Sequence, residues 1–149
     1  MTRAFLIGLI GFVLVACAPT QERADAPDFS AALQTHLKSV QDRDLETYLT
    51  TITDADALPL IFPNGEIMST RAAVVDFHTN WFADPDWRME FDVIGTIVGD
   101  DMAVATLRTE YRDTPDGTPR AGILGLVFQL QNGSWRLIHD QNTRIVTPT

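Results

Sequence analysis

Three histidines are the side chains in this sequence whose ordinary pKa lies nearest neutral pH, so they are the first candidates for acid–base chemistry. They are His36, His78 and His139. His139 is the best of the three, because Gln141 follows it at the spacing of one strand face, which offers a ligand an imidazole and an amide together. The alternative, which ranks ahead, is a buried histidine that ties the last strand to a helix. His78 could reach a cavity mouth or be structural, and His36 is assigned no role.

A second pair of polar groups lies on another predicted strand. Arg108 and Glu110 are two residues apart, so their side chains share a face. If that face lined a cavity, Glu110 would be a second titratable group, and Arg108 would be its partner or an anion clamp. The alternative is an exposed ion pair worth less than about 1 kcal/mol, and we favour it.

Large apolar side chains recur on the predicted helices and strands at spacings typical of a protein core. If the helices stand off the sheet, the same residues would line a ligand pocket, together with Arg108 and Gln141. The predicted apolar pocket residues are Tyr48, Phe62, Trp81, Trp87, Phe91, Leu126 and Phe128.

Several classes of function find no support in the sequence. The chain has 11 Lys and Arg against 20 Asp and Glu, so no basic surface for nucleic acid is expected. The histidines are far apart, and the acidic residues lack the spacing of a calcium loop, so no metal site is expected. We find no glycine-rich phosphate loop and no nucleophile motif, and therefore expect no cofactor.

The amino terminus has the pattern of an export signal. Met1–Arg3 is a short basic start, and residues 4–15 are an apolar run that is too short to span a bilayer as a stable helix. The run ends in Leu14–Cys17, which looks like the lipobox of bacterial lipoproteins. Residues 1–16 are thus predicted to be a lipoprotein signal peptide, with Cys17 lipidated and the chain held on a membrane in the cell envelope or periplasm.

Two alternatives compete with lipidation. Ala16–Ala18 also fits a simple cleavage site, and the apolar run could be a retained anchor. Lipidation is favoured because Cys17 is the only cysteine, and a lone free thiol is a liability in an oxidising compartment. The polar segment that follows, residues 17–27, is expected to be a flexible tether. Residues 28–149 are expected to form one domain.

Helical patterns precede strand patterns in the domain. Apolar residues recur at helical spacing from Phe29 to Val40 and from Leu45 to Ile52, with Asp28 as the N-cap of the first helix and Asp44 as the start of the second. A hairpin is predicted around Pro63-Asn64-Gly65, and a third helix with Ser69 as its cap. Four strands separated by turn signals follow. This order predicts an α+β domain with the helices on one face of an antiparallel sheet.

The last hairpin fixes which side chains share a face. If Asn132-Gly133 is a two-residue turn, Leu126 faces His139 and Leu124 faces Gln141. These four residues then lie on the more apolar face, which should point towards the helices. A shift of one residue in register would reverse the assignment. The other face suits either a modest homodimer interface or a solvated sheet.

The pattern as a whole resembles the nuclear transport factor 2-like superfamily, and in particular its SnoaL-like branch. The segments that carry the resemblance are residues 133–143, Leu60–Gly65 and Phe77–Trp81 with Asp84 and Pro85. The resemblance implies a cone-shaped fold of three N-terminal helices on a curved sheet, often dimeric. Where that branch has a second histidine and a serine, this chain has Gln141 and Thr143. Its members include polyketide cyclases, ketosteroid isomerases, dehydratases and proteins without known activity.

The sequence therefore favours a lipid-anchored domain of the cell envelope that binds a small apolar or amphipathic ligand without established catalysis. The alternative is a cyclase, isomerase or dehydratase that uses His139 as general acid or base, assisted by Glu110 or Arg108.

Overall fold

The computed structural model describes residues 27–146, which form three helices and one sheet of six strands. The strand order in the sheet is β2-β1-β6-β5-β4-β3. The predicted α+β fold is confirmed. The elements in chain order are α1 (Phe29–Asp42), α2 (Leu45–Thr51), β1 (Ala57–Ile61), β2 (Ile67–Thr70), α3 (Arg71–Ala83), β3 (Arg88–Val98), β4 (Met102–Arg112), β5 (Arg120–Gln131) and β6 (Ser134–Arg144).

The helices begin at polar caps that the sequence supplies. Asp28, the predicted N-cap of α1, accepts a hydrogen bond from the Ser30 amide, and Asp44 is the N-cap of α2, where it accepts one from the Thr47 amide. The cap of α3 was predicted at Ser69 but is Thr70, which accepts from the Ala73 amide. The difference of one residue arises because β2 extends through Thr70 before the chain turns into the helix.

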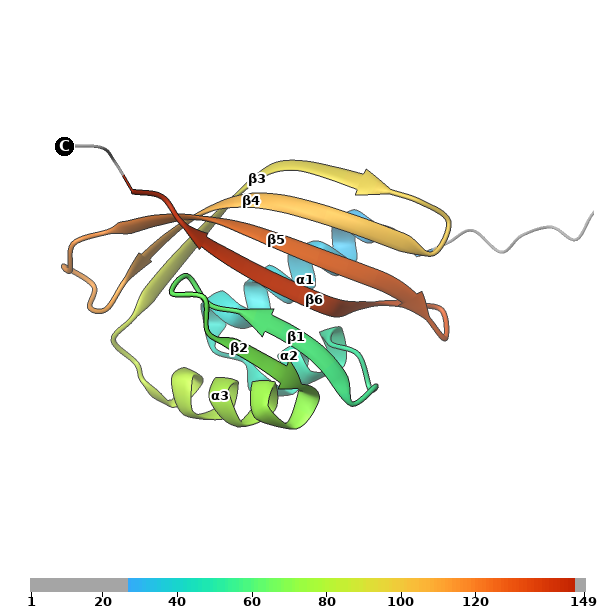
Figure 1. The fold of residues 1–149 in the computed structure, drawn as a ribbon, viewed down its shortest axis with the longest axis horizontal. Coiled ribbons are helices and arrows are strands. Elements are labelled where there is room, and N and C mark those ends of the chain that lie inside the picture. The colour runs from blue at the N-terminus through green and yellow to red at the C-terminus, as the bar shows by residue number, and fades with distance from the viewer. Residues whose placement is uncertain (1–26, 147–149) are drawn as a thin grey trace, which may run out of the picture.

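The sheet is mixed, whereas an antiparallel sheet was predicted. Strands β3 to β6 form an antiparallel meander, but β1 runs parallel to β6, with Leu60 opposite Asp140 and Ile61 opposite Gln141. The β1–β2 hairpin therefore joins the main sheet at its β6 edge. In Figure 1 the long strands curve over the helices, and α3 lies below the β1–β2 hairpin.

The core lies between the helices and the concave face of the sheet. Side chains alternate along the strands, so that one face of β4, β5 and β6 is buried against the helices. Phe29 of α1 packs edge-on against Phe128 and Trp135, with 5.4 Å between ring centroids in each pair. The buried apolar residues of these strands are Ala103, Ala105, Leu107, Leu124, Leu126, Phe128, Trp135 and Leu137.

A β-bulge in β6 reverses the predicted orientation of its second half. The hairpin begins as predicted, with Asn132 and Gly133 at positive φ and Phe128 opposite Leu137. The register then shifts, and Val127 pairs with His139 because Ile138 is an extra residue in the strand. Asp140 consequently lies opposite Leu126, on the inner face. The prediction that His139 and Gln141 face inward was wrong.

The bulge occurs where β6 is held on its other edge as well. The Thr53 amide donates to the Leu137 carbonyl at 2.9 Å, and Ile52 forms a parallel bridge with Leu137. Beyond the bulge, β1 pairs with the same strand. Segments distant in sequence therefore pair with β6 on both sides of the bulge, whereas the turn between β5 and β6 sets only the first few pairs.

The predicted signal peptide, Cys17 and nearly all of the tether lie outside the described residues. Within residues 27–146, no helix has the length and apolar character needed to cross a membrane.

Candidate functional site

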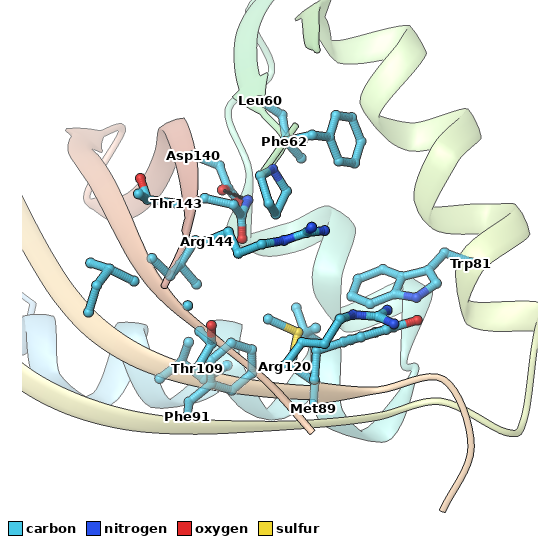
Figure 2. A pocket seen from close by; sticks show the side chains of 18 of the residues that line it. Leu60, Phe62, Trp81, Met89, Phe91, Thr109, Arg120, Asp140, Thr143 and Arg144 are labelled. Carbon is cyan, nitrogen blue, oxygen red and sulfur yellow. Dashed lines mark hydrogen bonds between the residues drawn. The ribbon is translucent and has the colours of Figure 1, made fainter. Parts of the chain in front are cut away.

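A cavity of about 430 Å³ lies between the helices and the concave face of the sheet. Its walls come from α1, α2, α3 and from strands β1, β3, β4, β5 and β6. This volume is within the range of small-molecule sites. Figure 2 shows Phe62 and Trp81 on one side of the open space, and Met89 and Phe91 on the opposite side.

The aromatic wall is built on α3. Phe77 and Trp81 are one helical turn apart and stack with 5.6 Å between centroids, so both present their rings to the cavity. Trp81 also stacks on Trp87 at 4.3 Å, and the Trp87 indole donates to the Trp81 carbonyl at 2.7 Å. Trp87 therefore lies behind Trp81 and fixes the position of that ring.

Two buried histidines line the inner part of the cavity. His36 shares a hydrogen bond with Thr51 Oγ1 at 2.8 Å, and His78 Nδ1 donates to the Val74 carbonyl at 2.8 Å. Burial lowers the pKa of His36 to about 3, with a smaller contribution from the charge of His78. Burial lowers the pKa of His78 to about 4. Both imidazoles are therefore neutral near pH 7 and act as structural donors and acceptors.

Tyr48 has an unpaired hydroxyl in this inner part. Its ring stacks on His78 at 4.2 Å, and the whole residue is 1% exposed. Among the described residues, its hydroxyl finds no hydrogen-bond partner. Burial raises the pKa of Tyr48 well above its ordinary value, and the Asp140 carboxylate raises it further. Such a hydroxyl is an uncommitted donor and acceptor, on a residue that lines the cavity.

Asp140 is the titratable carboxyl of the cavity. It is half-buried, accepts a hydrogen bond from Asn142 Nδ2 at 2.8 Å, and lies with that asparagine on the inner face of β6. Burial raises the pKa of Asp140 to about 7, and the hydrogen bond from Asn142 opposes this rise. A carboxyl with this pKa can donate or accept a proton near neutral pH.

Two arginines lie at the strand ends that border the cavity. Arg120 of β5 forms a bidentate ion pair with Asp113, at 2.5 and 2.7 Å, and lies over the Tyr111 ring. Arg144 of β6 is exposed, and Figure 2 shows its side chain extending across the open space. Its guanidinium makes no hydrogen bond or ion pair with another residue that the structure describes.

Four of the predicted pocket residues line the cavity, namely Tyr48, Phe62, Trp81 and Phe91. The other predicted pocket residues do not. Trp87, Leu126 and Phe128 are almost fully buried in the core, and Arg108 and Gln141 are exposed on the outer face of the sheet. Leu126 and Phe128 face inward as predicted, but the helices cover them, so they are packing residues.

The two predicted catalytic residues lie away from the cavity. His139 pairs with Val127 on the outer face of the sheet, because the bulge at Ile138 turned it away. Glu110 also lies on the outer face, where it pairs with Arg112 instead of Arg108. The alternation along β4 explains this position, since Leu107 and Thr109 take the inner face.

Sequence reasoning missed several residues that the structure brings to the cavity. Asp140, Asn142 and Arg144 were missed because the register was taken as regular through Ile138. Phe77 was named only as the first residue of a segment that carries the family resemblance. The sequence did offer one signal for Asp140. It is the neighbour of His139 and therefore lies on the opposite face of β6, and in the structure that face points inward. No group of three metal-ligating side chains occurs within the described part of the chain.

A curved mixed sheet that encloses a cavity with three helices defines the cone-shaped nuclear transport factor 2-like class of protein. Three solved structures illustrate the similarity. A Thiobacillus denitrificans protein, named as a calcium/calmodulin-dependent protein kinase type II association domain, is 18% identical with a TM-score of 0.70, over 80% of this chain and 97% of that one. A Streptomyces avermitilis protein, named as a dehydratase from the nuclear transport factor 2-like family, is 16% identical with a TM-score of 0.69, over 83% of this chain and 97% of that one. A ketosteroid isomerase-like protein from Erwinia carotovora atroseptica is 18% identical with a TM-score of 0.64, over 79% of this chain and 94% of that one.

The family model of the SnoaL-like domain matches residues 30–144, so the chain belongs to this family. The solved chains are covered almost completely, which means that in them the fold stands as a unit by itself. At these identities the likeness concerns the fold. No curated protein matches this chain in sequence.

Proposed function

We propose that the chain is a lipid-anchored protein of the cell envelope whose SnoaL-like domain holds a small apolar or amphipathic molecule in its cavity. The observation that carries the proposal is a cavity of about 430 Å³ with aromatic walls in which the buried Tyr48 hydroxyl has no partner among the described residues. An apolar wall with a few polar groups is the usual character of a small-molecule site. A bound molecule would supply the hydrogen bond that Tyr48 lacks.

The binding proposal is tested with a neutral apolar fluorophore. N-phenyl-1-naphthylamine is titrated into residues 18–149, which contain the whole described unit. We expect saturable binding that Phe62→Ala weakens several-fold, because Phe62 lines the cavity. Ile67→Ala is the matched control, since Ile67 lies on the same hairpin and is 61% exposed. Fluorescence that rises without saturation, or that both variants reduce equally, would contradict the proposal.

The anchor is proposed on the sequence pattern at Leu14–Cys17. Full-length chain expressed in a bacterium should incorporate labelled palmitate and partition into the detergent phase, whereas Cys17→Ser should do neither. A wild-type chain that stays unlabelled in the aqueous phase would argue for simple cleavage. If neither the wild-type chain nor Cys17→Ser incorporates palmitate, and both remain in the detergent phase, the result would argue for a retained anchor.

A homodimer through the outer face of the sheet is also proposed. Ile97 and Val104 are paired neighbours on β3 and β4, and they are 75% and 36% exposed. Exposed aliphatic neighbours of this kind suit an interface. Sedimentation of residues 18–149 should give a dimer that Val104→Asp dissociates and the control Ile67→Asp does not. A monomer at all accessible concentrations would exclude the interface.

Acid–base catalysis is the second candidate, and the pKa of about 7 at Asp140 is what favours it. The enzyme would be a cyclase, isomerase or dehydratase in which Asp140, inside the cavity, moves a proton to or from a bound carbonyl compound. The test follows deuterium exchange at the α-carbon of a small cyclic ketone by NMR. Exchange that Asp140→Asn abolishes supports catalysis, and equal rates with both proteins leave the chain as a binding protein.

A further inference from the structure

The edge of the cavity carries a local positive charge in a protein of net charge −9. Among the described residues that line the cavity, the charged types are Arg120, Asp140 and Arg144. Their positions differ. Asp140 lies beside Asn142 on the inner face, whereas Arg120 is the first residue of β5 and Arg144 the last residue of β6, both at the cavity's border.

The two arginines are not equivalent. The guanidinium of Arg120 is occupied by two hydrogen bonds to the Asp113 carboxylate, which balances its charge. Arg144 has no such partner among the described residues, and no acidic side chain other than Asp140 lines the cavity with it. The uncompensated charge at the border is therefore that of Arg144.

The position of Arg144 makes its charge more effective than that of an ordinary surface arginine. Figure 2 shows its side chain directed across the open space towards Trp81, with Phe62 above it. Apolar walls exclude water from one side of the guanidinium, so an anion bound there would be screened less than in bulk solvent. The planar group offers paired donors that fit the two oxygens of a carboxylate.

We infer that the cavity selects an amphipathic carboxylate, whose apolar body lies along the aromatic wall and whose anionic group is held by Arg144 at the border. The inference rests on the proposed binding function and specifies the ligand class. A medium-chain fatty acid has this form: its chain occupies the space between Phe62, Trp81 and Phe91, and its carboxylate stays at the solvent side. The aromatic wall recognises the body, and Arg144 recognises the charge.

The experiment compares ligands that differ only in the head group. Displacement of N-phenyl-1-naphthylamine from residues 18–149 is measured at low salt with decanoate, decanol and decyl phosphate. We expect decanoate to bind more tightly than decanol by about tenfold, the effect of one charge-assisted contact. Arg144→Gln should abolish the difference by weakening decanoate alone. Arg108→Gln is the matched control, because Arg108 is exposed on the outer face of the same sheet.

The possible outcomes distinguish failure of the carboxylate inference from failure of the proposed binding function. Equal binding of decanoate and decanol to the wild-type chain would overturn the anion site and leave an apolar pocket. A preference for decanoate that survives in Arg144→Gln would also overturn the role of Arg144. Tighter binding of decyl phosphate than of decanoate would replace the carboxylate with a phosphate. If the fluorophore binds saturably but none of the three displaces it, the inference is overturned and the proposed binding function stands. Absence of saturable fluorophore binding would overturn both.

Discussion

Leu126 lies directly opposite Asp140 across the pair formed by β5 and β6, and this pairing places the carboxyl on the inner face of the sheet. The neighbouring His139 points to the outer face. One extra residue, Ile138, thus decides whether the cavity contains an imidazole or a carboxyl.

The stability of the fold should depend on the protonation of Asp140. Its pKa in the folded chain is raised to about 7 from 3.8, so the folded state holds the proton more tightly than the unfolded state does. The stability gained from this proton is complete below pH 3.8 and is lost as the pH rises to about 7. Asp140→Asn removes the loss and should be more stable than the wild type by about 2 kcal/mol at pH 8.

This difference is measured by urea unfolding of residues 18–149 at several pH values. The variant should gain on the wild type in free energy of unfolding as the pH rises from 3.8 to about 7, and the difference should stay level above that. A constant difference across this range would show that the carboxyl titrates normally in the folded chain.

Replacing His139 should have little effect on the cavity. Its ring lies on the outer face of the sheet, opposite Val127, so His139→Ala removes no group that lines the cavity. We expect a loss of less than about 1 kcal/mol in the free energy of unfolding and unchanged binding of the neutral fluorophore. A loss of binding as large as that of Phe62→Ala would mean that the inner face carries His139 after all.

The Tyr48 hydroxyl should lower stability and support binding. It is buried without a partner among the described residues, so Tyr48→Phe removes an uncompensated polar group at no cost in ring packing. We expect the ligand-free variant to be more stable by about 1 kcal/mol. Any ligand that hydrogen-bonds to the hydroxyl should bind it less tightly. Thermal unfolding and titration of the same samples check both effects, and a clear loss of stability would show that the hydroxyl is already paired.

The buried histidines should make the fold sensitive to acid. Folding lowers the pKa of His78 to about 4 from 6.5, so the unfolded chain binds this proton more tightly. The stability that results is complete above pH 6.5 and is lost as the pH falls towards 4. His36, whose pKa is lowered to about 3, acts in the same direction.

The contribution of His78 can be isolated with His78→Gln, which keeps a donor for the Val74 carbonyl. Packing will make the variant less stable at every pH, but its stability should change less between pH 6 and pH 5, by about 1 kcal/mol. Urea unfolding at both pH values gives this slope. An unchanged slope would mean that His78 is protonated as easily in the folded chain as in the unfolded chain.

The helices and most of the strands could be predicted because their signals are local. Asp28 caps α1 as expected, and the second helix begins after Asp44 as expected, since a cap needs only a side chain and amides two or three residues away. Asn132 and Gly133 form the predicted turn for the same reason. Tyr48, Phe62, Trp81 and Phe91 were assigned to a pocket from their spacing and from the family resemblance, and they line the cavity.

The sequence by itself thus determined the order of the elements, the α+β class and the apolar character of the inner face. Only the tertiary structure decided which polar groups share that face. The bulge at Ile138 lies between residues that pair with β1 and with Ile52 and Thr53, far away in the sequence. Because side chains alternate along a strand, this single insertion exchanges the faces of all the residues that follow it, and no pattern within the strand itself specifies it.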